Sequence, residues 1–191
     1  MKVSAVILAG GESRRMGHDK ARLQLDGMTW LEAAVAKVRA AGASEVFISG
    51  RAGMEYEAAG CPVLFDLEPG LGPLGGIERG LHACTGELLL VLAVDMPRIT
   101  SECLGGMLAK CDRLTGAVPR LRCGLEPLAA IYPRRCHEIA RRFLAERNCV
   151  AREFAAACVR EKAVRTVAFK ESEAKLFANW NSPEDLPTLP Q

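Results

Sequence analysis

The chain has 191 residues, of which 49% are hydrophobic and 25% are charged, and its formal net charge is +2. This length fits one domain with a substantial core, and the composition is that of a globular rather than a disordered protein. A nucleic-acid-binding protein would show a clear basic excess, and this chain has none. The apolar runs are too short for a secretory or membrane-spanning segment. We therefore expect a cytoplasmic protein without nucleic-acid or membrane partners.

Short apolar runs rich in β-branched residues alternate with helical patterns along the chain. In chain order we expect a strand at 3–9, a helix at 29–41, strands at 45–49 and 62–65, a helix at 73–84, a strand at 87–94, a helix at 101–110, strands at 117–118 and 128–132, helices at 135–146 and 150–158, a strand at 164–169 and a short helix from Pro183. Such alternation predicts one three-layer α/β/α domain with a mostly parallel sheet.

Local signals support several of these elements. Thr29 and Glu32 have the spacing of a capping box, and Pro73 is suited to the first position of a helix. The run 87–94 is continuously apolar, as in a strand that is buried on both faces of a parallel sheet. Strands 117–118 and 128–132 are expected near a reversal in the sheet. Ligands of such sheets bind at the carboxyl ends of the strands.

The eight cysteines are scattered, without a C-x-x-C pair, and the sequence shows no cluster of histidines. Zinc sites need closely spaced, paired ligands, so we expect no structural metal site. The cysteines are expected to be reduced and mostly buried. His82, inside a predicted helix, is expected to have a structural role.

The first loop, residues 8–20, contains L-A-G-G-E-S-R-R-M-G-H-D-K. Glycines directly after a strand let backbone N–H groups approach phosphate oxygens, and the basic side chains of Arg14, Arg15 and Lys20 can neutralise a triphosphate. The spacing fits neither the P-loop nor the dinucleotide-binding fingerprint. A turn with exposed basic residues is the alternative interpretation, and the complete string favours a triphosphate site.

Asp95 is the first acidic residue after the most apolar predicted strand. A carboxylate at the carboxyl end of a parallel strand is well placed for Mg²⁺, which prefers one or two carboxylates together with phosphate oxygens and water. On position alone, Asp95 fits a turn-capping role before Pro97 equally well. Asp66, after strand 62–65, is by itself more typical of a turn residue than of a ligand.

Five segments, taken in order, resemble the molybdenum cofactor guanylyltransferases, a group of nucleotidyltransferases. They are the first loop, G-P-L-G-G-I at 72–77, D-M-P at 95–97, E-P-L-A-A-I-Y at 126–132 and N-W-N-S-P-E-D-L at 179–186. The resemblance covers nearly the whole chain. It implies one Rossmann-like domain of the nucleotide-diphospho-sugar transferase type over residues 1–191, with a nucleotide-binding N-terminal part and an acceptor-binding C-terminal part.

The resemblance implies transfer of GMP from GTP to the phosphate of molybdopterin or molybdenum-molybdopterin, with Mg²⁺ as cofactor and release of pyrophosphate. Other cofactor-biosynthesis proteins or molybdoenzyme chaperones are implied as further partners. The implied catalytic residues are Arg15, Lys20 and Asp95, with Asp95 as the metal ligand. The implied GTP-binding residues are Leu8, Ala9, Gly10, Gly11, Lys20, Ser49, Asp66, Gly72, Pro73, Leu74 and Asp95. The implied acceptor-binding residues are Glu126, Pro127, Asn179 and Asn181.

Three other functions remain open. The sister enzymes that attach CMP usually have L-A-A-G in the first loop and lack G-P-L-x-G, so Gly10 and segment 72–76 favour guanine by analogy. The family often has Asn where this chain has Ser49, which leaves base recognition there open. Sugar- or alditol-phosphate nucleotidyltransferases usually have longer chains. A non-catalytic nucleotide-binding adaptor would not need Arg15, Lys20 and Asp95 together.

Overall fold

The structure is a computed structural model that describes residues 1–10, 24–25, 27–51, 56, 60–66, 68 and 70–180. The strands are β1 (Val3–Leu8), β2 (Gln24–Leu25), β3 (Met28–Thr29), β4 (Glu45–Gly50), β5 (Val63–Phe65), β6 (Leu88–Ala93), β7 (Gly116–Leu121), β8 (Gly124–Leu125), β9 (Ala129–Pro133) and β10 (Val164–Ala168). The helices are α1 (Trp30–Ala40), α2 (Gly72–Ala83), α3 (Ser101–Leu108), α4 (Cys136–Ala145) and α5 (Ala151–Arg160), with a 3-10 helix, η2, at Glu171–Phe177.

The main sheet has the strand order β10–β7–β9–β6–β1–β4–β5, with β8 paired to β7. Strand β1 is parallel to β4 and β6, β4 is parallel to β5, and β10 is parallel to β7. Strand β9 runs antiparallel to both β6 and β7, which is the expected reversal. The prediction of a mostly parallel sheet is confirmed.

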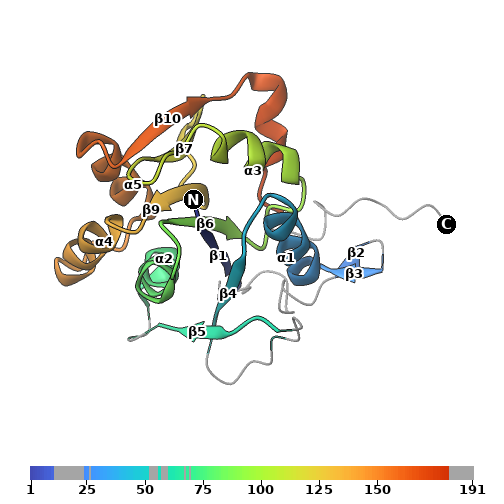
Figure 1. Cartoon of the computed structure of the whole chain (residues 1–191), viewed down its shortest axis with the longest axis horizontal. Coiled ribbons are helices and arrows are strands. Elements are labelled where there is room, and N and C mark those ends of the chain that lie inside the picture. Colours follow the sequence, from blue (N-terminus) through green and yellow to red (C-terminus); the bar gives the residue numbers. More distant parts are fainter. Residues whose placement is uncertain are drawn as a thin grey trace.

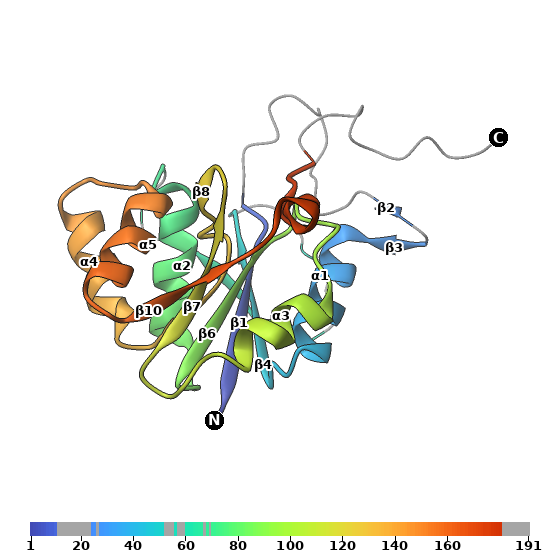
Figure 2. The same cartoon turned by 90° about the horizontal axis from the view of Figure 1, so that it is seen from above.

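Helices cover both faces of this sheet (Figures 1 and 2), with α1 and α3 on one face and α2, α4 and α5 on the other. The residues of β1 alternate between the two cores, because successive side chains of a strand point to opposite faces. Ala5 and Ile7 pack in the core beneath α1 and α3, whereas Val6 packs in the core beneath α2, α4 and α5. The expected three-layer α/β/α architecture is therefore confirmed.

The capping box at the start of α1 is also confirmed. The Glu32 N–H donates to Thr29 Oγ1 over 3.2 Å, and the Thr29 N–H donates to Glu32 Oε2 over 2.8 Å. The hydrogen bonds from Thr29 lower the pKa of the Glu32 carboxyl below its usual value. The helix that was expected from Pro73 begins one residue earlier, at Gly72. The expected short helix from Pro183 lies outside the described residues.

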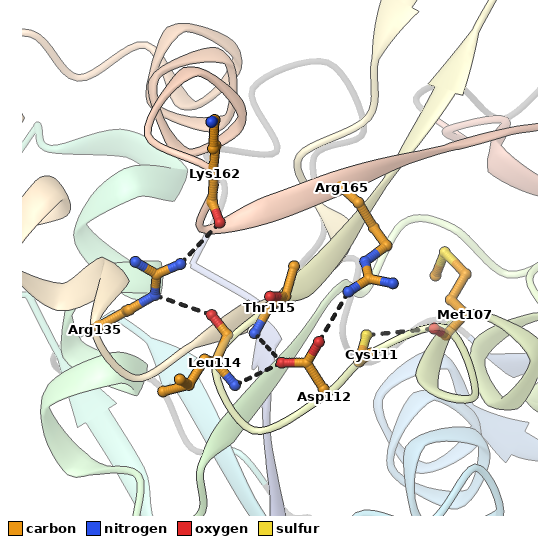
Figure 3. Close-up of polar contacts among 8 residues, drawn as sticks. All are labelled: Met107, Cys111, Asp112, Leu114, Thr115, Arg135, Lys162 and Arg165. Atoms are coloured by element: carbon orange, nitrogen blue, oxygen red, sulfur yellow. Dashed lines mark hydrogen bonds and ion pairs between the residues drawn. The ribbon is translucent and has the colours of Figure 1, made fainter.

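A network of polar contacts holds the turn between α3 and β7, at the end of the sheet where β1 begins (Figure 3). Asp112 accepts hydrogen bonds from the backbone N–H groups of Leu114 and Thr115 and forms an ion pair with Arg165 over 2.9 Å. Arg135 donates to the carbonyl oxygens of Leu114 and Lys162. The network thus connects this turn to the start of α4 and to the turn before β10.

All eight cysteines are free, and Cys123 is the exposed one among them. Cys61, Cys84, Cys136 and Cys158 are buried and Cys103, Cys111 and Cys149 are partly buried, so half of the thiols, rather than most of them, are fully buried. In the part of the chain that the structure describes, no helix has the length and apolar character needed to cross a membrane.

Candidate active site

The carboxyl ends of β1, β4 and β6 lie side by side and bring three of the predicted segments together. Leu8 pairs in register with Ser49 of β4 and with Ala93 of β6. The Ala9 N–H donates to the Ser49 carbonyl oxygen over 2.8 Å, and the Val94 N–H donates to the Leu8 carbonyl oxygen over 3.1 Å. Ala9 and Gly10 after β1, Ser49 and the segment that carries Asp95 therefore share one edge of the sheet.

The backbone approaches closely where the first loop leaves β1. A Cβ atom on Gly10 would lie 3.6 Å from the carbonyl carbon of Gly50, in van der Waals contact. Gly50 in turn packs against the ring of Tyr56, whose hydroxyl accepts a hydrogen bond from the Arg51 N–H over 2.8 Å. The start of the predicted triphosphate loop is thus fixed against the end of β4.

Helix α2 begins at the same edge, and its first turn has no side-chain cap. Gly72 has a φ of +60°, the left-handed conformation that favours glycine, and the residue before it supplies no side-chain cap. Pro73 follows at the start of the helix, where its missing N–H costs nothing. The N–H groups and dipole at such a helix start favour a negatively charged ligand.

Two glycines allow α2 to lie directly on the ends of the strands. A Cβ atom on Gly75 would come within 2.9 Å of Asp66 Oδ2. A Cβ atom on Gly76 would come within 2.3 Å of Ser49 Oγ and 2.8 Å of Leu8 Cδ2. The G-P-L-G-G segment therefore has a packing role that its sequence pattern did not indicate. It positions Asp66 and Ser49 beside the first turn of α2.

The carboxyl of Asp66 is partly buried, and one of its oxygens has no hydrogen-bond partner among the described residues. Burial raises the pKa of its carboxyl; the charge of Arg79 opposes this effect and that of Glu78 adds to it. Asp66 Oδ1 and Arg79 Nε are both buried, and neither has a hydrogen-bond partner among the described residues. An unpaired buried polar atom costs about 1–3 kcal/mol, so a bound ligand that supplies a donor to Asp66 would recover this energy.

Asp95 lies half-buried in the turn after β6, close to segment 178–180. Its carbonyl oxygen accepts a hydrogen bond from the Trp180 N–H over 2.9 Å. The Trp180 ring packs edge-on against Trp30, with centroids 5.8 Å apart, and the guanidinium of Arg98 lies 5.5 Å from its centre. These contacts bring the exposed Asn179, which precedes Trp180, to the same region as Asp95.

Glu126 is the second carboxylate at this edge. Its Oε1 accepts a hydrogen bond from the Leu128 N–H over 3.1 Å, and the Leu128 carbonyl oxygen accepts one from Ala93 over 2.8 Å. Burial raises the pKa of the Glu126 carboxyl; Leu128 and Arg152 lower it, and the negative charge of Asp95 raises it. Asp95 and Glu126 are thus close enough to interact, and two carboxylates beside the edge where phosphate binding is predicted would offer the oxygen ligands that Mg²⁺ prefers.

The other predicted site residues fall into two groups. Gly11, Arg15, Lys20 and Asn181 lie outside the described residues. The side chain of Leu74 is completely buried in the core beneath α2, so only its backbone remains available for the predicted contact with GTP. Pro127 is buried as well, and its carbonyl oxygen accepts a hydrogen bond from the hydroxyl of Tyr132 over 3.1 Å.

Residues 5–164 match the model of a family described as the MobA-like NTP transferase domain. The probable molybdenum cofactor guanylyltransferase of Opitutus terrae is 42% identical over 96% of this chain and 92% of its own length. A protein of the same description from Pelotomaculum thermopropionicum is 35% identical over 97% of this chain and 91% of its own.

Solved structures show the same fold. Molybdopterin-guanine dinucleotide biosynthesis protein A from Archaeoglobus fulgidus superimposes with a TM-score of 0.70 at 25% identity, over 97% of this chain and 94% of that one. A nucleotidyl transferase from Methanothermobacter thermautotroptrophicus superimposes with a TM-score of 0.74 at 20% identity, over 96% and 94% of the two chains.

Proposed function

Because this chain belongs to the MobA-like NTP transferase family, we propose that it transfers GMP from GTP to the phosphate of molybdopterin or molybdenum-molybdopterin and releases pyrophosphate. Relatives that match over nearly their full length carry the guanylyltransferase name. The observation that carries the proposal is the meeting of β1, β4 and β6 at one edge, where Ala9, Ser49 and the turn with Asp95 lie together.

In the proposed reaction, an oxygen of the acceptor phosphate forms a bond to the α-phosphorus of GTP. The bond between this phosphorus and the oxygen that bridges the α- and β-phosphates breaks, and pyrophosphate leaves with that oxygen. The acceptor phosphate is already ionised near pH 7, so this step needs no general base from the protein. Catalysis then depends on in-line positioning and on charge neutralisation. Arg15 and Lys20 are proposed to bind the triphosphate and the departing pyrophosphate.

A bound Mg²⁺ would supply positive charge at the α-phosphate. Asp95 is the proposed ligand, and Glu126 is a candidate second ligand because its carboxyl lies within electrostatic range of Asp95. The residues of this edge fit such an ion, since they offer carboxylate oxygens rather than nitrogen or sulfur atoms.

The nucleoside of GTP is proposed to lie beside the start of α2, with donors facing Asp66. Leu8, Ala9 and Gly10, together with Gly11, would line the phosphates, and Ser49, Gly72, Pro73 and the Leu74 backbone would lie nearer the nucleoside. The acceptor is proposed to bind on the side of Glu126, Pro127, Asn179 and Asn181. This arrangement assigns the nucleotide to the N-terminal part of the chain and the acceptor to the C-terminal part.

We also propose that the protein works in the cytoplasm, with other cofactor-biosynthesis proteins or molybdoenzyme chaperones as partners.

The base preference is tested by titrating the protein with each of the four nucleoside triphosphates in the presence of Mg²⁺. We expect the tightest binding for GTP. Tighter binding of CTP would overturn the guanylyl assignment while leaving the fold and the type of reaction in place.

The metal ligand is tested by replacing Asp95 with alanine and measuring GTP-dependent modification of molybdopterin at saturating Mg²⁺. We expect turnover to fall by about a hundredfold or more, because a transition-state contact is lost. Glu138→Ala is the matched control, since it removes an exposed carboxylate at the start of α4. Helix α4 follows Pro133, which pairs with Leu88 at the start of β6, whereas Asp95 follows the other end of β6. Normal turnover of Asp95→Ala would exclude Asp95 as the ligand.

A further inference from the structure

Three potential metal ligands that are distant in the sequence meet between α2 and α4. Glu78 and His82 are one helical turn apart on α2, so they share a face of that helix. His137 is the second residue of α4, which packs beside α2 (Figure 1). One ligand atom from each of these three side chains lies within 4.8 Å of the other two. Two histidines that are far apart in the sequence therefore meet in the folded chain, at a place where the sequence predicted no metal site.

The three side chains already contact one another. Glu78 Oε1 lies 2.7 Å from His137 Nε2, and the rings of His82 and His137 have centroids 5.4 Å apart. Glu78 is buried, His137 is partly buried and His82 is exposed. The contact with His137 already satisfies the buried carboxylate of Glu78, and a divalent cation between the two groups would replace this contact with a positive charge.

The spacing is close to that of a coordination sphere. Ligand atoms bound to zinc lie about 2.0–2.2 Å from the ion, which places neighbouring ligands of a tetrahedral site roughly 3.3–3.5 Å apart. Glu78 and His137 would have to separate by less than about 1 Å to reach that spacing. The side chain of His82 is exposed and can rotate to complete the set.

We propose that Glu78, His82 and His137 bind one divalent transition-metal ion, with zinc the best match and a water molecule in the fourth position. Two imidazoles and one carboxylate form a ligand set that suits zinc, nickel or cobalt, whereas Mg²⁺ prefers oxygen ligands alone. The site is distinct from the edge that holds Asp95. It lies in the half of α2 remote from Gly72, and the ion would tie α2 to α4.

The test titrates zinc chloride into the full-length protein after a chelator has removed bound metal. An Asp95→Ala background removes the proposed magnesium ligand, so that it does not add a second binding event. We expect one equivalent of zinc to bind and to raise the Tm, because a ligand of the native state stabilises it. Adding His82→Ala should weaken zinc binding by about tenfold or more and remove the rise in Tm.

His82→Ala is the first variant to make because His82 is exposed, whereas a change at the buried Glu78 also alters packing. Glu138→Ala in the same background is the matched control, since Glu138 adjoins His137 but is not a member of the cluster, and zinc affinity should stay unchanged. Failure of the Asp95→Ala protein to bind zinc, or equal affinity after His82→Ala, would overturn the proposal.

The cysteines are a second possible source of zinc ligands, and cobalt distinguishes them. Cobalt bound by nitrogen and oxygen gives weak visible bands, whereas thiolate ligands add an intense near-ultraviolet band. We expect the visible bands alone, and we expect them to be lost with His82→Ala. An intense thiolate band that His82→Ala leaves unchanged would assign the metal to cysteines and reject the site.

Discussion

At Gly75 and Gly76 the missing side chains leave the space that Asp66 and Ser49 occupy. The strand-end residues Leu8 and Asp95 could be predicted from the sequence, because a residue that follows a buried parallel strand must lie at the binding edge. The need for glycine at these two positions could not be predicted. It depends on neighbours from β4 and from the loop after β5, and no local pattern indicates which elements will touch α2.

Gly76→Ala should therefore destabilise the protein. The new methyl group would lie 2.3 Å from Ser49 Oγ and 2.8 Å from Leu8 Cδ2, and crowding of this kind costs about 1–3 kcal/mol. The free energy of unfolding, measured by denaturant titration, checks this loss. Gly105→Ala in α3 is the matched control: its methyl group would meet nothing within 4 Å, and alanine favours the helix by about 0.5–1 kcal/mol. Equal effects of the two substitutions would argue against close packing at Gly76.

Asp66→Asn should stabilise the free protein and weaken its binding of GTP. The pKa of Asp66 is raised in the folded state, so its contribution to stability is fully present below its unfolded pKa of about 3.9 and is lost as the pH rises through the folded value. Removing the charge should raise the free energy of unfolding at pH 7 but not below about pH 4. Loss of a charged hydrogen bond should weaken GTP binding by about tenfold or more. Unchanged affinity would remove Asp66 from the site.

Among the secondary-structure elements, strong local signals made most of the helices and long strands predictable. The capping box of Thr29 and the apolar run of β6 are each formed by residues close together in the sequence, so they can be recognised without knowledge of the fold. Strands β2, β3 and β8 have two residues each, too few to show any period, and the 3-10 helix η2 was missed as well. The closeness of Glu126 to Asp95 was also hidden. It arises because β9 runs antiparallel beside β6 and carries Leu128 back to Ala93.

Asp112→Ala should lower the Tm by about 2–4 °C, an amount typical of one lost interaction in a domain of this size. The variant removes the acceptor for the N–H groups of Leu114 and Thr115 and the partner of Arg165. The hydrogen bond from Leu114 lowers the pKa of Asp112, so this stabilisation is present above its unfolded pKa of about 3.9 and is lost as the pH falls further. Asp112→Asn keeps an acceptor oxygen, so its Tm should fall less. Thermal unfolding at neutral pH compares the two variants, and an equal fall in Tm would assign the whole effect to the charge of Asp112.

For the molecule as a whole, segment 178–180 packs the last described residues against α1 and the turn after β6. Trp180 packs on Trp30 of α1 and donates to the Asp95 carbonyl oxygen. The sequence predicted that the Asn179 region belongs to the acceptor side, but it held no signal for the ring contact or for the backbone hydrogen bond. The cluster of Glu78, His82 and His137 was hidden for the same reason, since folding alone brings α2 and α4 together.

Trp180→Ala should cost about 3 kcal/mol or more in the free energy of unfolding, the usual price of removing a buried large aromatic side chain. Alanine keeps the backbone N–H that donates to Asp95 but loses the ring that holds segment 178–180 against Trp30, so turnover should also fall under conditions where the variant remains folded. Trp180→Phe keeps a ring against Trp30 and is the control, with a smaller loss expected in both measurements. A stable, fully active Trp180→Ala protein would show that segment 178–180 does not support the site.

The hydrogen bond from Trp180 to Asp95 also determines when the surroundings of Asp95 can be completed during protein synthesis. Strands β1, β4 and β6 leave the ribosome early, and the turn that contains Asp95 follows directly after them. Its partner, Trp180, is encoded much later, so this hydrogen bond cannot form until residue 180 has left the ribosome. The surroundings of Asp95, the proposed metal ligand, are therefore complete only after nearly all of the described chain has emerged.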